Sequence, residues 1–206
     1  MIYIAWPTVE FSTFRVDIEG SFLTTIDLVP ALAERVRQGQ RAERFSGSGE
    51  MTNAYRKPAG PGWALVGDAG YLKDPITAFG ISDAFRDAEL LATALDDGFT
   101  GRQPLEEALD HYEQQRNAAS KPFYEFTLDT AQMKPLVVEQ IELLRALTHQ
   151  PVAASQFFGV LTGIVQPTEF FRPQNLFQIL GVRGMTKIVL NKVLHPPQKR
   201  VMARPV

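Results

Sequence analysis

The stretch that most constrains the fold runs from Trp63 to Leu95. It opens with a short, almost wholly apolar run, Trp63–Val66, and Gly-Asp-Ala-Gly follows at 67–70. Such a run between glycines is typical of a strand buried on both faces. A loop leads to Gly80, after which apolar residues recur with the period of a helix until Asp-Gly at 97–98. The pattern predicts a strand–loop–helix unit, and therefore a fold class between α/β and α+β.

The flanking segments predict the remaining elements. Alternating and aromatic residues favour strands at 2–6 and 12–18, and a helical period favours a helix at 28–37. Beyond the unit the chain is expected to be mainly helical, with helices from Pro104 and over 122–132, 135–148, 151–165, 173–180 and 185–193.

Composition narrows the class of protein. Apolar residues make up 45 % of the 206 residues, and the formal net charge is −2, so the whole-chain balance does not indicate nucleic acid. The chain has no cysteine, which excludes disulfides and thiolate chemistry and fits a cytoplasmic location. The longest apolar stretch, 157–165, is much shorter than the ~20 residues of a transmembrane helix. We therefore expect no membrane-spanning segment.

The predicted strand–loop–helix unit has a chemical use. Asp68 would project from the end of the strand as a hydrogen-bond acceptor for a sugar-like hydroxyl. The start of the helix at Gly80 would offer unpaired backbone N–H groups to a phosphate. The alternative is an ordinary connection between a strand and a helix, which any α/β protein contains.

The residues themselves resemble a known motif. Residues 60–75, GPGWALVGDAGYLKDP, and 80–91, GISDAFRDAELL, resemble the second FAD-binding motif of the aromatic-hydroxylase-type (class A) flavin monooxygenases. Residues 109–116, LDHYEQQR, resemble the helix that follows in that family. The resemblance implies three parts: the end of a substrate-domain sheet with a return helix at 1–59, the C-terminal part of an FAD-binding domain at 60–120, and a helical region with a basic tail at 121–206.

The resemblance also assigns residues to the cofactor. Asp68 would accept a hydrogen bond from the ribityl chain of FAD, Gly67 and Ala69 would shape that turn, and Pro75 would lie beside the flavin ring. The backbone of Ala78, Phe79, Gly80 and Ile81 would lie near the flavin or its pyrophosphate. The family uses NAD(P)H and O2 to hydroxylate a small organic substrate. Because the reactive group belongs to the cofactor, no catalytic side chain and no metal site are expected.

Two motifs of the family, its Gly-x-Gly-x-x-Gly unit and its middle Asp-Gly motif, are absent from these 206 residues. The first of them seats the ADP half of FAD. We therefore expect an N-terminally truncated chain that binds FAD weakly or not at all by itself, with a second chain as a source of the missing segment. Half of a split enzyme, or a non-catalytic remnant that acts as a binding or interaction protein, are the alternatives.

The end of the chain has a different character. From Arg183 onward it carries six Lys and Arg residues and no Asp or Glu. Such a segment would bind anionic lipid or the acidic face of a partner, or would be a solvated end.

Overall fold

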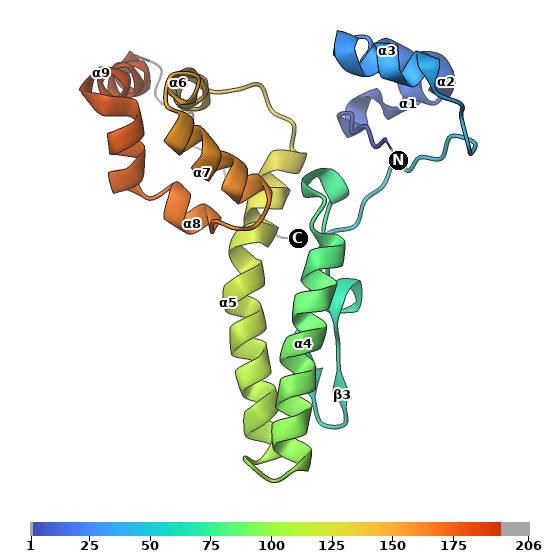
Figure 1. Cartoon of the computed structure of the whole chain (residues 1–206), viewed down its shortest axis with the longest axis vertical. Helices are drawn as coiled ribbons and strands as arrows, with labels where there is room; N and C mark the ends of the chain where they lie inside the picture. The colour runs from blue at the N-terminus through green and yellow to red at the C-terminus, as the bar shows by residue number, and fades with distance from the viewer. Residues whose placement is uncertain (1, 195–206) are drawn as a thin grey trace, which may run out of the picture. The chain divides into compact units, whose positions relative to one another are not determined.

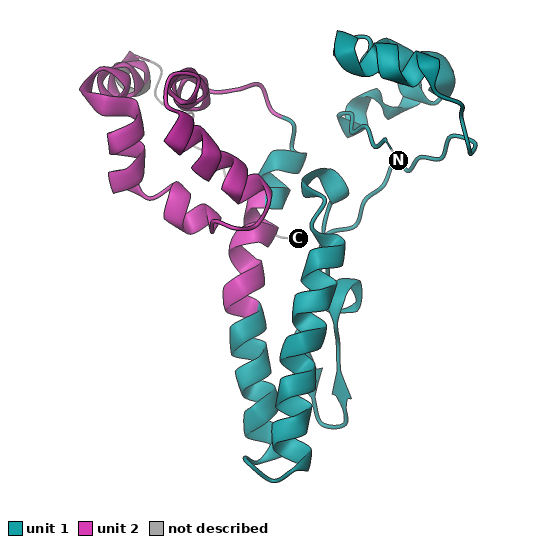
Figure 2. Cartoon of the chain, in the orientation of Figure 1, with its two compact units in different colours: residues 1–116, 127–133 teal, residues 117–126, 134–206 magenta. Residues whose placement is uncertain are grey.

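The computed structural model describes residues 2–194, and these are mostly helical with a few short strands (Figure 1). The strands pair only as two antiparallel two-stranded ladders, so the fold is α+β. Among the described residues, no helix is long and apolar enough to cross a membrane. The chain forms two compact units, residues 1–116 with 127–133 and residues 117–126 with 134–206 (Figure 2).

The first unit begins with short helices, and here the sequence-based prediction of a sheet was wrong. Residues 2–6 have no strand partner in the described part of the chain, and the expected strand at 12–18 is helical. The helices are η1 (Thr8–Glu10), α1 (Phe11–Phe14), α2 (Ile18–Ile26) and α3 (Pro30–Gln38). The carboxylate of Asp17 accepts the backbone N–H of Gly20 at 2.9 Å and so caps α2. This capping bond outweighs the alternating pattern. The helix predicted at 28–37 is confirmed as α3.

Four two-residue strands follow in the first unit. Strand β1 (Ala54–Tyr55) pairs with β4 (Tyr71–Leu72), and β2 (Ala59–Gly60) pairs with β3 (Trp63–Ala64). Pro61 and Gly62 connect β2 to β3, and the φ of 79° at Gly62 suits a type II turn. The prediction of a strand at 63–66 is right for its first half only. Its burial on both faces was wrong, because Trp63 in this hairpin is 45 % exposed.

Two long helices follow, and residues 117–126 of the second one belong to the second unit. Helix α4 (Gly80–Phe99) begins at the predicted residue. Helix α5 (Leu105–Ala131) runs through Pro122, where the sequence predicted a new helix. Proline removes one backbone N–H, and the helix continues because residues on both sides of it, such as Ser120 and Phe123, are buried. The start of α5 packs beside α4 around a small apolar core (Figure 1) of Ala59, Ala94, Ala108 and Tyr112.

The second unit is a helical cluster with a conventional apolar core. Its helices are α6 (Val138–Leu147), α7 (Pro151–Leu161), α8 (Pro167–Phe170) and α9 (Pro173–Leu194). The core contains Leu143, Leu147, Ala153, Val160, Phe170 and Ile179. Helix α9 is broken at Gly181, where φ is 60°, a backbone conformation that glycine adopts most easily. This break explains why the sequence predicted two helices there. Of the basic tail, Lys199, Arg200 and Arg204 lie outside the described residues.

Candidate ligand-binding site

The first unit has a small cavity at the start of α4. Its volume is about 210 Å³, and the residues that line it are Met51, Gly67, Asp68, Tyr71, Leu72, Lys73, Asp74, Pro75, Ala78, Gly80 and Asp83. Five of the eight residues that the resemblance assigned to FAD are among them. Ala69, Phe79 and Ile81 are not, and Ile81 is 76 % exposed. The fold therefore gathers most of the expected residues, and their role as cofactor ligands stays a prediction.

Two turns build the wall of this cavity. The first, η2 (Gly67–Ala69), begins with Gly67 at φ 57°, and a Cβ there would lie 2.9 Å from the Cβ of Ala84 on α4. Glycine at 67 therefore allows both the backbone conformation and the close approach to α4. The guanidinium of Arg56 donates a hydrogen bond to the carbonyl of Ala69 at 3.0 Å. The turn that carries Asp68 is therefore fixed from both sides.

The second turn leads directly into α4. In η3 (Pro75–Thr77) the carboxylate of Asp74 accepts the backbone N–H of Ile76 at 2.9 Å. Ala78 then adopts the left-handed conformation at φ 56°. Residues other than glycine rarely adopt this backbone conformation, and those that do concentrate at ligand sites. Helix α4 follows without a side-chain hydrogen bond at its N-cap, Phe79, so the backbone N–H groups of its first turn remain available to a ligand.

Three carboxylates line the cavity, and that of Asp68 is the one available to a ligand. Asp74 is held by its own turn, and Asp83 is ion-paired with Lys73 and Arg86. Within residues 2–194 the Asp68 carboxylate forms no hydrogen bond or ion pair, and it is exposed. Its Oδ1 lies 3.8 Å from where a Cβ on Gly80 would be. A hydrogen-bond acceptor and a helix N-terminus therefore lie side by side.

Behind the cavity lies a buried cluster of charged side chains. Asp83 and Asp87 are 2 % and 0 % exposed. Arg86 donates to Asp83 at 2.8 Å, to Asp87 at 3.0 Å and to the Tyr71 hydroxyl at 2.7 Å. Lys73 pairs with Asp83 and lies 5.5 Å from the centre of the Tyr71 ring. These contacts join the cavity wall to the first turns of α4.

The cluster shifts the acid–base properties of its members. Burial raises the pKa of Asp87 above its usual value, although Arg86 opposes the shift. Burial also raises the pKa of the Tyr71 hydroxyl, and the charge of Asp83 adds to the effect. On α5, burial raises the pKa of Tyr112 to about 12, and its hydroxyl donates to the carbonyl of Leu65 at 2.6 Å. Both tyrosines therefore remain neutral at neutral pH, with the Tyr71 hydroxyl accepting from Arg86 and the Tyr112 hydroxyl donating to Leu65.

Arg116 on α5 completes the support of this region. Its guanidinium stacks over the rings of Tyr55 and Tyr71, at 4.4 and 4.6 Å from their centres. It also donates to the carbonyl of Arg56 at 3.2 Å and is fully buried. Strands β1 and β4, which precede and follow the Asp68 turn, are thus attached to α5. Arg116 lies in the segment that resembles the family.

Sequence reasoning missed these buried charges. Ile81 and Phe85 belong to the apolar period of α4, yet they are 76 % and 74 % exposed. The buried face of the first two turns is instead that of Asp83 and Asp87. Their spacing of four residues, with Arg86 between them, places them on one side of the helix but does not tell whether that side is buried.

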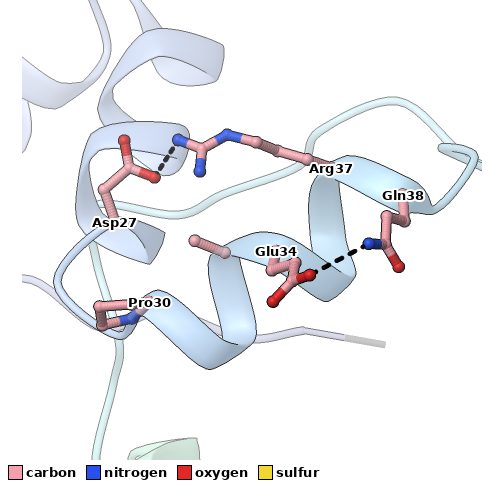
Figure 3. Close-up of a pocket in the computed structure, with 6 residues that line it drawn as sticks. Asp27, Pro30, Glu34, Arg37 and Gln38 are labelled. Atoms are coloured by element: carbon pink, nitrogen blue, oxygen red, sulfur yellow. Dashed lines mark hydrogen bonds and ion pairs between the residues drawn. The ribbon is translucent and has the colours of Figure 1, made fainter.

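A second cavity lies on α2 and α3 and is larger, at about 430 Å³. Figure 3 shows its polar side chains turned toward one another. Arg37 pairs with Asp27, and Gln38 donates to Glu34 at 3.4 Å. Because these exposed groups satisfy one another, this cavity offers fewer free groups to a ligand than the one beside α4. The described residues contain no cluster of His, Asp or Glu suited to a metal ion.

Comparisons with protein-family models, with curated proteins and with solved structures gave no match to this chain.

Proposed function

We propose that this chain contributes one wall of the FAD site of a flavin-dependent monooxygenase that hydroxylates a small organic substrate with NAD(P)H and O2. The observation that carries the proposal is the placement of Asp68 beside the uncapped start of α4. A carboxylate without an internal partner suits a ribityl hydroxyl, and exposed backbone N–H groups suit a pyrophosphate. The flavin would supply the redox chemistry, and the residues of this chain would bind and orient it.

The size of the cavity supports a partial site. Cavities that enclose a drug-sized ligand usually measure about 300–1,000 Å³, and this one measures about 210 Å³. Three hydrogen bonds at the upper end of the range of about 0.5–1.5 kcal/mol each would correspond to a dissociation constant on the order of 1 mM. The residues therefore fit one portion of FAD, and a Gly-x-Gly-x-x-Gly segment from elsewhere would have to hold the ADP half.

The exposed face of α4 supports a role for further polypeptide. Ile81, Phe85, Ala88 and Ala92 follow one another at helical spacing and are all exposed. An apolar stripe of this kind is typical of a surface that another element covers. It favours a second chain or segment beside the flavin, and it is also the observation that favours the alternative of a non-catalytic interaction protein. The proposal includes a cytoplasmic location for the protein.

Titration of FAD with the purified 206-residue chain tests the proposal, with ligand-observed NMR to detect weak binding. We expect saturable binding on the order of 1 mM, weakened about fivefold or more by Asp68→Ala, which removes the acceptor. Asp110→Ala, on the exposed side of α5, is the matched control and should leave binding unchanged. Tight binding of one yellow flavin per chain would contradict the partial site. Equal affinities of the two variants would contradict the role of Asp68.

A further inference from the structure

The second half of α9 is apolar on two opposite faces. One face is buried in the second unit through Gly184 and Ile188. The other exposes the aliphatic side chains of Val182, Leu190 and Leu194, which are 72 %, 54 % and 72 % exposed. A row of exposed aliphatic side chains on a helix is typical of a surface that binds something. The packing of the second unit therefore accounts for the buried face of α9 but not for its exposed aliphatic face.

Two basic residues lie within this exposed face, among its aliphatic side chains. Arg183 and Lys187 precede Leu190 and Leu194 at spacings of seven residues, so on a helix they lie along the same side. Arg183 is exposed, and Lys187 donates to Glu142 on α6 at 2.9 Å. Residues 183–206 carry six Lys and Arg and no Asp or Glu. The sequence of this part of the chain is thus basic, and of the two cations on the exposed face Lys187 is paired with Glu142 while Arg183 is exposed.

We propose that this outer face of α9 binds the surface of an anionic lipid bilayer. Aliphatic residues would enter the boundary between headgroups and acyl chains, and the cations would interact with the anionic headgroups. The helix would lie on the bilayer, in keeping with the finding that no described helix can span one. This proposal is independent of the flavin site.

Two observations favour lipid over other occupants. A second copy of the chain would bring like charges together, because the whole of 183–206 is basic. A folded acidic partner would be expected to use a groove or pocket, and neither of the two cavities described above includes a residue of α9. An aliphatic face that also carries cations suits a deformable anionic surface better.

Co-sedimentation of the 206-residue chain with lipid vesicles tests the proposal. One set of vesicles contains phosphatidylcholine alone, and the other contains phosphatidylcholine and phosphatidylglycerol in equal parts. We expect binding to the second set only, and weaker binding at high salt. Equal binding to both sets, or to neither, would overturn the proposal. So would a dimer in solution that dissociates when Val182 is replaced by Asp, since that result would assign the face to a second copy.

Matched variants locate the binding surface. Val182→Asp should weaken partitioning about tenfold, whereas Val152→Asp on α7, where valine is 75 % exposed, should leave it unchanged. Arg183→Glu should weaken it about tenfold as well, whereas Arg35→Glu on the exposed side of α3 should not. Circular dichroism checks the fold, and the milder Leu190→Ser replaces Val182→Asp if that variant unfolds. Equal losses at the test and control positions would contradict the assignment to α9.

Discussion

The first turns of α4 and the cluster of α6 to α9 bury different kinds of side chain. Around α4 the buried residues include Asp83, Asp87 and Arg116, whereas the second unit buries residues such as Val160 and Phe170. Removing charges from water costs free energy, and the attraction between paired charges offsets only part of that cost. An apolar core has no such cost. Ionic groups with shifted pKa values concentrate at functional sites. The comparison therefore favours a binding role around α4 and a stabilising role for the core of the second unit.

The largest effect is expected where a buried ion pair is broken. Asp83→Ala leaves Lys73, which is 8 % exposed, without its anionic partner. We expect a loss of about 3–5 kcal/mol in the free energy of unfolding, measured by urea denaturation. Asp96→Ala on the same helix removes an exposed pair with Arg102 and should cost less than about 1 kcal/mol. Similar costs for both variants would show that the cluster around α4 is not a buried ionic core.

A glycine of the cavity wall should come next. Gly67→Ala puts a Cβ 2.9 Å from that of Ala84 and keeps a φ of 57°. We expect a loss of about 2–3 kcal/mol in stability from backbone strain and crowding. Gly62→Ala is the matched control, because its φ is 79° but nothing lies within 4 Å of the added Cβ. The difference between the two variants measures the close approach of η2 to α4, and no difference would argue against that approach.

The apolar core of the second unit should respond more moderately. Val160→Ala removes two methyl groups from a fully buried site, which should cost about 2 kcal/mol. The loss should be independent of salt, because no charge is involved. Chemical denaturation with urea at low and high salt measures this. A strong salt dependence would contradict the contrast between the two regions.

The smallest expected effect is a difference in the sign of pH dependence. Burial raises the pKa of Asp87 above its ordinary value of 3.8. The contribution of Asp87 to the free energy of unfolding is therefore present below pH 3.8 and is lost as pH rises through the raised pKa. The hydrogen bond from Lys187 lowers the pKa of Glu142 below its ordinary 4.5. That contribution is present above pH 4.5 and is lost as pH falls through the lowered pKa. Asp87→Asn and Glu142→Gln should therefore change the slope of stability against pH in opposite directions in acid, as thermal unfolding would report. Changes of the same sign would contradict the assignment.

The sequence predicted much of the helical framework, because its signals are local. Pro30, Pro151 and Pro173 each open a helix, and Gly80 begins α4 as expected. The strands at 2–6 and 12–18 were wrong, because a strand needs a partner and Asp17 caps a helix instead. The main turn residues of the site could be named from the motif. The buried charges could not, because a carboxylate on a helix face looks the same in sequence whether solvent or a tyrosine lies against it.

The measurement that tests the central claim most directly is NMR mapping of backbone amides during titration of the 206-residue chain with FAD. We expect shifts at Gly67, Asp68 and Gly80 that saturate together, with none in the cavity formed by α2 and α3 and none in α6 to α9. Shifts centred on Arg37 and Gln38, or an absence of shifts at concentrations on the order of 1 mM, would contradict the claim that the start of α4 is a wall of a flavin site.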